Sequence, residues 1–572
     1  QYAGFSNLTP QWKDRQNRDY GDKLYRNDTV LFTDQTLGAG IKTNILGFGL
    51  GLGISDVNND GWPDIYVSND YNEEDYLYIN NQDGTFSDQL PEYMAHVSLS
   101  SMGSDIADYN NDGYTDILTL DMLPEDNFRQ KVMFGPDNYD KYERLLSSGF
   151  YDQSMRNMLH LNNQGKGFSE IGQLAGVSGT DWSWASLFAD FDNDGNKDLF
   201  ITNGYRHDYT NMDFMNFLVS EKIKENQGGN TLSAMETIEQ MPSILLPNYM
   251  YQNRGDLTFD NVTASWGLDQ VSLSNGAAYA DLDNDGDLDL VVNNVNEQAF
   301  VYRNNARELN QYNYLKVMLN GEGMNTRGIG AKVTVNCGDQ LFVQELMPTR
   351  GFQSAVDHVL LFGLGTNTEI DRVEVKWPDG RVQRLTAQQV NQTLVIHQKD
   401  AVKSNEAFEG ARNATLFLKD SISIFTHQEN SFIDFKRQQL LLHKISTLGP
   451  RIAIADLNKD GLQDIYAAGA KGSAGQLILQ DRSGAFETAW ESEPAFEDVG
   501  VHFFDADGDG DQDLYVVSGG ADFDPEDPLL QDRLYRNNGG GKFQRDPEAL
   551  PVMLTSGSSV ASADFDQDGD LD

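Results

Sequence analysis

The chain has 572 residues and a formal net charge of −46, from 88 acidic and 42 basic side chains. A chain of this length is expected to form two or more domains, because one domain usually has about 150 residues. The negative charge argues against nucleic-acid binding, which depends on counterion release by lysine and arginine. Cys337 is the one cysteine, which excludes an intrachain disulfide and a zinc cluster built from thiolates. No apolar run reaches the about 18 residues of a membrane helix, and no signal peptide is evident.

The first part of the chain repeats a pattern of short predicted strands. Residues 77–81 form one strand, Asp83-Gly84 make a hairpin turn, a second strand starts at Phe86, and residues 101–107 lead into an acidic loop. Residues 116–120 form the strand that leaves the loop. The same order is present earlier, at residues 24–51, and it returns around residues 159–168, 250–259 and 534–543. The repeat predicts sheets of four short strands.

Seven loops share one spacing of oxygen-bearing side chains, with Asp or Asn at positions 1, 3, 5 and 9 and Gly at position 6. Calcium takes six to eight oxygen ligands at about 2.3–2.6 Å, so alternate side chains of a tight turn can converge on one ion. Gly at position 6 permits the sharp bend. The predicted ligands are Asp56, Asn58, Asp60 and Asp64; Asp108, Asn110, Asp112 and Asp116; Asp190, Asp192, Asp194 and Asp198; Asp281, Asp283, Asp285 and Asp289; Asp456, Asn458, Asp460 and Asp464; Asp505, Asp507, Asp509 and Asp513; and Asp564, Asp566, Asp568 and Asp572.

The backbone carbonyl at position 7 is the predicted fifth protein ligand of each loop. It belongs to Trp62, Tyr114, Asn196, Asp287, Leu462, Asp511 and Asp570. We therefore expect up to seven structural calcium ions; magnesium fits less well, because it demands a stricter octahedron. An EF-hand is excluded because position 12 lacks the bidentate Glu and is Val67 in the first loop and Val292 in the fourth. The alternative is a metal-free turn, since Asp, Asn and Gly dominate turns.

The distance between loops predicts the architecture. Successive loops begin 52, 82 and 91 residues apart in the first part of the chain and 49 and 59 residues apart after residue 456. A period near 50 residues with four strands per unit is typical of β-propeller blades. The long intervals contain two insertions with a helical pattern, at 121–156 and 204–247. Each insertion is either packed on the rim of the propeller or an arm that binds a partner or ligand.

The pattern changes from Tyr314, where alternating strands are predicted without an acidic loop. We expect an all-β protein with a first propeller over residues 1–310, a small sandwich-like β domain over 311–400 and a connector over 401–430. A second propeller begins at 431 and continues to 572. Both propellers are expected to be seven-bladed and incomplete in this chain, the first lacking N-terminal blades and the second truncated.

These motifs resemble known protein families. The acidic loops and their strands resemble the FG-GAP or VCBS repeat of calcium-binding propellers. Residues 314–398, with Asn325-Thr-Arg-Gly-Ile-Gly330, Phe362-Gly-Leu-Gly365 and Trp377-Pro-Asp-Gly380, look like the ASPIC/UnbV domain. Together they resemble the cartilage-acidic-protein-like family common in the Bacteroidota. The resemblance implies a secreted or surface-exposed protein, often with a signal sequence and a lipid anchor, at the bacterial outer membrane.

A catalytic set is not evident in the sequence. The eight histidines are scattered, and His160 falls inside a predicted strand. Arg206-His207-Asp208 is one polar cluster at a loop, and Trp182 and Trp184 are candidates either for blade packing or for stacking on a sugar or a partner. No phosphate-binding loop or nucleophile elbow is present.

The favoured function is therefore a calcium-stabilised surface or secreted binding or scaffold protein that contacts protein or glycan. The resemblance implies a setting beside a TonB-dependent nutrient transporter and its surface lipoprotein. The alternatives are a polysaccharide lyase or hydrolase on a propeller scaffold and an integrin-like adhesin.

Overall fold

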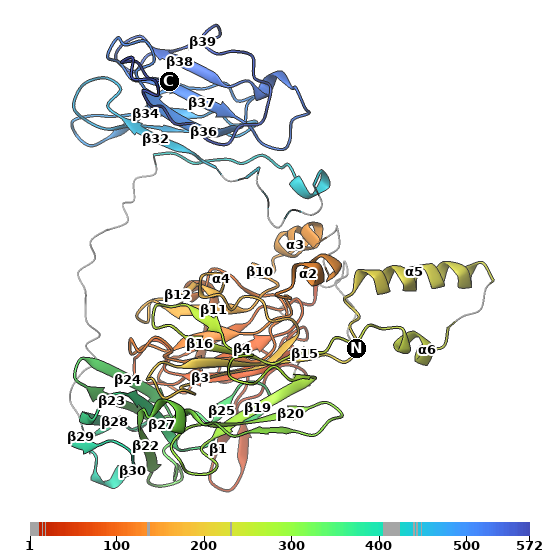
Figure 1. The fold of residues 1–572 in the computed structure, drawn as a ribbon, viewed down its shortest axis with the longest axis vertical. Helices are drawn as coiled ribbons and strands as arrows, with labels where there is room; N and C mark the ends of the chain where they lie inside the picture. The colour runs from red at the N-terminus through yellow and green to blue at the C-terminus, as the bar shows by residue number, and fades with distance from the viewer. Residues whose placement is uncertain are drawn as a thin grey trace. The chain divides into compact units, whose positions relative to one another are not determined.

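The computed structural model describes residues 11–13, 15–17, 19–133, 138–228, 232–403, 424–438, 441, 444, 446–447 and 449–572. The chain forms two compact units, Gln1–Arg412 and Asn413–Asp572. Strands dominate both units (Figure 1), which confirms the predicted all-β class. Among the described residues no helix is long and apolar enough to cross a membrane.

Four successive antiparallel sheets form most of the first unit. In each, the predicted acidic loop joins the first two strands. The strands are β3 (Gly49–Ser55), β4 (Asp64–Asn69), β5 (Tyr76–Asn80) and β6 (Phe86–Asp88); β8 (Ser104–Ala107), β9 (Asp116–Thr119), β11 (Met158–Asn162) and β12 (Phe168–Glu170); β13 (Ser183–Ala189), β14 (Asp198–Asn203), β16 (Tyr249–Asn253) and β17 (Phe259–Asn261); and β19 (Ser274–Ala280), β20 (Asp289–Asn294) and β21 (Phe300–Tyr302). This repeat confirms propeller-like blades; the number of blades per propeller stays a prediction.

Short elements connect these sheets or flank them. A two-stranded hairpin of β1 (Tyr25–Asn27) and β2 (Phe32–Asp34) precedes the first sheet. The others are α1 (Leu90–Tyr93), β7 (Val97–Ser98), β10 (Gln153–Ser154), α4 (Gly172–Ala175), β15 (Leu246–Pro247) and β18 (Val271–Ser272).

Apolar residues pack between neighbouring sheets and form the core. The central strands are buried on both faces for this reason, and β14 is buried along its full length. Between the second and third sheets, the Tyr109 ring stacks on Phe188 with centroids 5.7 Å apart and on Phe259 at 5.5 Å. Trp182 belongs to the same core cluster and stacks on Tyr205 at 3.9 Å, so it packs within the blades.

Both predicted insertions contain helices. The first holds α2 (Asn127–Met133) and α3 (Asn138–Ser147), and the second holds α5 (Met212–Asn226) and α6 (Ala234–Glu239). Asn211 caps α5 by accepting the N–H groups of Asp213 and Phe214. Ser233 and Glu236 form a capping box at the start of α6. The helices α5 and α6 project from the blades as an arm (Figure 1).

The small β domain follows α7 (Ala306–Asn310) and packs as two sheets around its own core. It contains β22 (Asn313–Asn320), β23 (Lys332–Cys337), β24 (Gln340–Glu345), β25 (Thr349–Arg350), β26 (Ser354–Ala355), β27 (Leu360–Gly365), β28 (Glu369–Lys376), β29 (Arg381–Gln389), β30 (Gln392–His397), the short helix η2 (Gln398–Asp400) and β31 (Val402–Lys403). The β domain and the four blades lie in one compact unit, and the second unit begins inside the predicted connector. The place of the β domain between two propellers stays a prediction.

The second unit contains two further four-stranded sheets. They are β32 (Ile452–Ala455), β33 (Asp464–Ala467), β34 (Gln476–Gln480) and β35 (Phe486–Glu491), and β36 (Asp498–Phe504), β37 (Asp513–Ser518), β38 (Arg533–Asn537) and β39 (Phe543–Asp546). Two short helices, η3 (Asp434–Lys436) and η4 (Pro528–Leu530), accompany them. Most of the predicted connector, residues 404–423, lies outside the described residues.

Candidate metal centres

All seven acidic loops adopt one backbone conformation. Position 6 is a Gly with positive φ in every loop, for example 91° at Gly61 and 100° at Gly286. Position 4 is also left-handed in every loop, although sequence analysis did not single it out. Its residues are Asn59, Asn111, Asn193, Asn284, Lys459, Gly508 and Gln567. Asn and Gly tolerate this conformation best, which explains their frequency at position 4.

The carboxylate at position 1 closes the turn. In the first loop, Asp56 accepts the N–H of Asp60 at 2.9 Å and the N–H of Gly61 at 2.8 Å. The N–H of position 7 donates to the position 5 carboxylate, as Trp62 does to Asp60 at 2.9 Å. The bonds from position 6 to position 1 and from position 7 to position 5 recur in all seven loops. The bond from position 5 to position 1 recurs in the second, fourth and fifth loops. Carboxylate oxygens lie within 4.8 Å of one another in Asp190, Asp192 and Asp194; Asp281, Asp283 and Asp285; Asp505, Asp507 and Asp509; and Asp564, Asp566 and Asp568.

The carboxylate at position 9 has a second role, which is to fasten the loop to its sheet. Asp64 accepts the N–H of Val57 at 3.1 Å and the N–H of Asn80, at the end of β5, at 2.8 Å. Asp116, Asp198, Asp289, Asp464 and Asp513 accept the equivalent pairs of N–H groups. Within the described residues, position 9 lies outside the converging groups of three carboxylates.

The third loop is the most strongly buried of the first unit. Its carboxylates are close together and removed from water, which disfavours their charged forms. Burial raises the pKa of Asp190 and of Asp198 well above the usual range, and the neighbouring carboxylates raise both further. Burial also raises the pKa of Asp192 to about 6. One oxygen of Asp190, and in the fourth loop one oxygen each of Asp285 and Asp287, is buried without a hydrogen-bond partner. Buried carboxylates of this kind fit a hard divalent cation with oxygen ligands, such as Ca²⁺.

Successive loops are linked to one another through position 4. Asn59 donates from its side chain to the carbonyl of Gly113 at 3.1 Å, Asn111 donates to Gly195 at 2.9 Å, and Asn193 donates to Gly286 at 2.9 Å. Each bond joins position 4 of one loop to position 6 of the next. The first four loops are therefore connected into one row by hydrogen bonds between neighbours.

Asparagines at the ends of the third strands add a further link between blades. Asn162 donates to the carbonyl of Val57 in the first loop at 2.8 Å and to that of Thr115 in the second at 2.9 Å. Asn253 and Asn304 make the same pair of bonds one and two blades further on.

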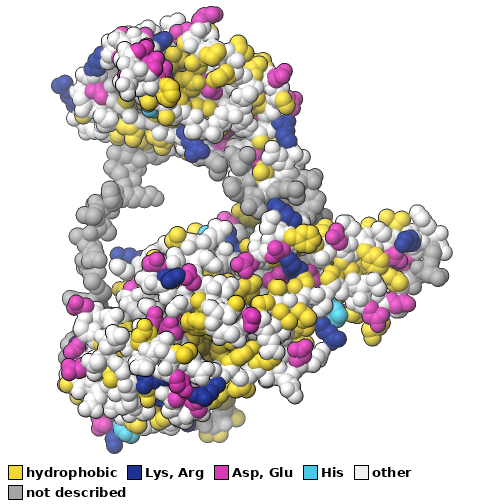
Figure 2. Space-filling model, in the orientation of Figure 1, with side chains coloured by type: hydrophobic (Ala, Val, Ile, Leu, Met, Phe, Trp, Pro, Cys, Tyr) yellow, Lys and Arg dark blue, Asp and Glu magenta, His cyan; other side chains and the backbone are white. Residues whose placement is uncertain are grey.

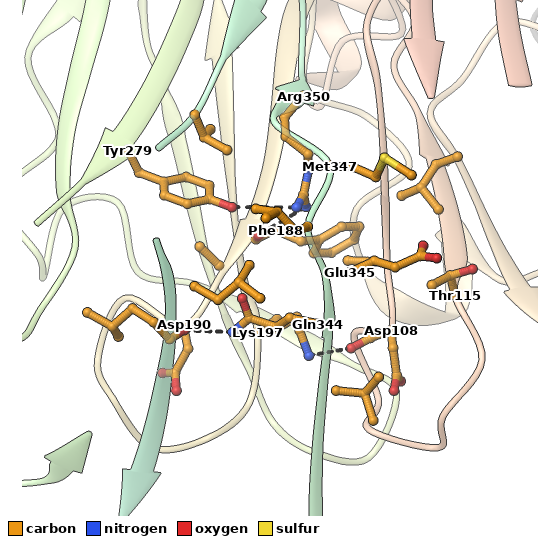
Figure 3. A pocket seen from close by; sticks show the side chains of 18 of the residues that line it. Asp108, Thr115, Phe188, Asp190, Lys197, Tyr279, Gln344, Glu345, Met347 and Arg350 are labelled. Atoms are coloured by element: carbon orange, nitrogen blue, oxygen red, sulfur yellow. Dashed lines mark hydrogen bonds between the residues drawn. The ribbon is translucent and has the colours of Figure 1, made fainter. Parts of the chain in front are cut away.

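The β domain reaches into the space between the innermost strands of the blades. The Arg350 guanidinium pairs with Asp105 of β8, and it lies 3.3 Å from the carbonyl of Phe188 and 3.5 Å from the Tyr279 hydroxyl (Figure 3). Asp105 raises the pKa of Arg350 against the lowering effect of burial, so the guanidinium stays charged. A cavity of about 40 Å³ remains around these residues, which makes this space a packed contact.

Three side chains of the β domain contact the acidic loops directly. Glu345 accepts the N–H of Asp56 at 3.5 Å and also the hydroxyl of Ser55, the residue before the first loop. Lys332 donates to the side chain of Asn59 at 2.8 Å and to the carbonyl of Gly113 at 2.9 Å. Lys316 forms an ion pair with Asp281. The loops therefore stabilise the blades and also form the surface on which the β domain sits.

Three of the remaining candidates, His160, Asp208 and Trp184, make contacts within the fold. His160 is buried in β11, where burial lowers its pKa to about 4, and its Nε2 lies 3.1 Å from the carbonyl of His96. Asp208 pairs with Arg129 at 3.0 Å, and the Trp184 indole donates to the carbonyl of Gly204 at 2.7 Å. Trp62 is 44% exposed.

Repeated propeller-like blades, each with a carboxylate loop between its first two strands, define an all-β repeat protein, and comparison with known families agrees. Residues 321–403 match the family described as ASPIC and UnbV. Residues 56–119 and 456–516 match the FG-GAP-like repeat. The chain therefore carries FG-GAP-like repeats in both units and an ASPIC and UnbV domain, and this combination suggests a surface or binding protein.

Searches of other proteins gave distant similarities. No curated protein matched the chain. Among solved structures, a lectin of Agrocybe aegerita that recognises non-reducing terminal N-acetylglucosamine aligns with a TM-score of 0.23 and 14% identity, over 91% of this chain and 86% of the lectin. The V. cholerae biofilm matrix protein Bap1 aligns with a TM-score of 0.16 and 10% identity, over 95% of this chain and 76% of Bap1. A protein from Lactobacillus plantarum aligns with a TM-score of 0.14 and 10% identity, over 78% of this chain and 98% of that protein.

Proposed function

We propose that this chain is a calcium-stabilised binding protein whose blades and ASPIC and UnbV domain form a platform, and whose α5–α6 arm binds a protein partner. The observation that carries the proposal is a stripe of exposed apolar side chains along α5. Met215, Val219 and Ile223 are 40%, 57% and 52% exposed. They follow one another at intervals of four residues, which places them on one face of the helix.

The rest of the arm supports a docking role. Phe214 is the one buried residue of α5, so the helix gains little from packing on the blades. Met235 and Ile238 of α6 are 66% and 39% exposed. Figure 2 shows hydrophobic side chains gathered along this arm. Contiguous exposed apolar surface is typical of protein interaction sites, and methionine adapts its shape to a partner.

Calcium is the ion that we propose for the acidic loops. Positions 1, 3, 5 and 9 would hold it, with the carbonyl at position 7, and position 9 also fastens each loop to its sheet. When bound, the ion would neutralise carboxylates that burial and mutual repulsion otherwise disfavour. A structural role is favoured because the loops contact other loops, blades and the β domain.

The setting that we propose is extracellular or at a bacterial outer membrane. Calcium at the millimolar level occupies even weak loops outside cells. The finer suggestions of a TonB-dependent transporter with its lipoprotein, or of a glycan, as the partner rest on the family resemblance given above. The proposed arm is directed at a protein.

The test compares two variants of the arm with equal added charge. Val219→Glu with Ile223→Glu places two carboxylates on the apolar stripe, whereas Asn216→Glu with Ser220→Glu places two on exposed polar positions of the same helix. Affinity purification from native membranes, with quantitative mass spectrometry, should recover a partner with the wild type and with the second variant. The proposal predicts that the first variant loses that partner. An unchanged partner set for the first variant would contradict it.

A further inference from the structure

The fourth blade differs from the others at its outer edge. The first, second and third blades and both sheets of the second unit have four strands, whereas β19–β20–β21 has three in the part of the chain that the structure describes. The outer edge of β21 therefore carries no paired strand there. Val301, in the middle of β21, is 65% exposed.

The backbone of Val301 is oriented for a fourth strand. Its counterparts in the other blades are Leu77, Leu159 and Met250, which stand at the same register beside the second strand. The carbonyl of each counterpart accepts an N–H from the residue after its fourth strand at 2.8 Å. The backbone N–H of each counterpart also points away from the second strand. It donates to the side chain of Asp88, Glu170 or Thr263. An unpaired strand edge of this kind is a template for another strand.

A cavity of about 540 Å³ lies beside this edge. Its lining matches the site that holds Phe259, the first residue of the fourth strand in the third blade. Phe259 stacks on Tyr109 and belongs to the same core cluster as Leu199 and Tyr251. The counterparts one blade further on are Phe191, Leu290 and Tyr302, and all three line the cavity.

The other fourth strands show which residue this position takes. Each begins with Phe, and in the first unit Asn at the end of the third strand pairs with it. The pairs are Asn80 with Phe86, Asn162 with Phe168, and Asn253 with Phe259. Asn304 is the counterpart in the fourth blade and lines the cavity. The cavity is thus shaped for an aromatic side chain of an added strand.

The outward N–H at this edge favours a strand that carries a carboxylate. The Arg303 side chain is 58% exposed and already pairs with Asp283 at 3.0 Å, Asp285 at 3.8 Å and Glu308 at 2.6 Å, so it is not the group that an incoming strand would neutralise. In the first unit, two residues after the Phe, the fourth strands carry Asp88, Glu170 and Asn261. A carboxylate two residues after the aromatic residue of an incoming strand would accept the N–H of Val301, as Asp88 and Glu170 accept the N–H groups of Leu77 and Leu159.

We infer that the edge of β21 and the adjoining cavity bind an extended segment of another polypeptide. Main-chain hydrogen bonds to Val301 give affinity in this mode, and the pocket for the aromatic side chain gives specificity. The segment carries Phe, or another aromatic residue, followed within two residues by Asp, Asn or Glu. This β21 site lies outside the arm and the metal loops, so it goes beyond the proposed function.

The experiment uses the full chain in calcium and a labelled peptide with the sequence of residues 255–264. A second peptide replaces its Phe259 with Ala. Fluorescence anisotropy should show saturable binding of the first peptide and at least about tenfold weaker binding of the second, because a buried aromatic anchor dominates such interfaces. Val301→Pro removes an outward N–H without breaking a bond to β20 and should weaken binding at least about tenfold. Val301→Thr keeps the N–H and should bind as the wild type does.

Several results would overturn the inference. Equal binding of both peptides, no binding at about 1 mM peptide, or equal binding by wild type and the proline variant would each do so. A concentration-dependent dimer that Val301→Pro abolishes would show that the occupant is a second copy. Binding that appears only after deletion of residues 1–10, where Gly4-Phe5-Ser6-Asn7 repeats the fourth-strand pattern, would show that the chain fills its own site. Either outcome contradicts a separate partner.

Discussion

Arg350 of the β domain forms a buried ion pair with Asp105 of the second blade, across 245 residues of sequence. The side chain of Asp105 is fully buried, and that of Arg350 is 12% exposed. The pair stands beside Phe188 of the third blade and Tyr279 of the fourth. One side chain of the β domain thus connects three blades.

Replacing Arg350 with Met should therefore destabilise the first unit by about 3–5 kcal/mol, because it leaves the Asp105 carboxylate buried without a partner. Denaturant unfolding followed by fluorescence measures this loss. Arg254→Met breaks an exposed pair with Asp260 and should cost less than about 1 kcal/mol. Equal losses for the two variants would mean that the Arg350 pair does not hold the domains together.

The bonds between successive loops can be tested at position 4. Asn193→Gly keeps the left-handed backbone but removes the donor to Gly286, so it should lower the free energy of unfolding by about 1–3 kcal/mol. Asn284→Gly is the matched control, because Asn284 has the same conformation in the last loop of this row and is exposed. The control should change stability by about 0.5 kcal/mol or less. If both variants melt alike, the loop-to-loop bond contributes nothing.

Close packing of the β domain on the third loop makes Gly363 irreplaceable. A Cβ at this position would lie 1.9 Å from an oxygen of Asp190 and 2.6 Å from the Asn193 Cα. Gly363→Ala should therefore cost at least about 3 kcal/mol or prevent folding, since backbone would have to move. In Gly38→Ala the nearest atom is 3.6 Å away, and the stability of that variant should stay near that of the wild type. Thermal melts compare the two variants. Normal yields and equal melting temperatures for both would refute this contact.

Glu170 makes the stability of the second blade depend on pH. Arg156 and His96, together with the N–H of Gly172, lower the pKa of Glu170 to about 2 although burial opposes them. The stabilisation is therefore complete above the usual carboxyl pKa of 4.5 and is lost as the pH falls toward 2. Glu170→Gln should cost about 2–3 kcal/mol at pH 7, and the gap to wild type should close with acidification. A gap that stays constant from pH 6 to about pH 3 would exclude this origin.

The sequence predicts the local structure well because each blade is encoded by nearby residues. Asp-Gly turns, the Phe that starts each fourth strand and the spacing of the acidic loops are short-range signals, and the strands around Asp56 and Asp108 lie where these signals place them. The contact of Arg350 with Asp105 depends on packing between segments that are distant in the sequence. No repeating sequence pattern therefore predicts it. Position 4 has a sequence signal, since Asn recurs there in the first four loops. Its hydrogen bond to the next loop cannot be predicted from that signal, because the two loops become neighbours only in the folded structure. Among the described residues β21 has no paired outer strand, and this is visible only when the blades are compared in space.

The melting temperature with and without calcium shows whether the acidic loops are structural metal sites. We expect scanning calorimetry of the intact chain in about 2 mM CaCl₂ to give a melting temperature at least about 10 °C higher than in EGTA, because each loop occupied at tenfold its Kd adds about 1.4 kcal/mol. Magnesium at the same concentration should restore little of this difference, and Asp285→Ala should reduce it only in part. A melting temperature that is the same in calcium and in EGTA would contradict the account.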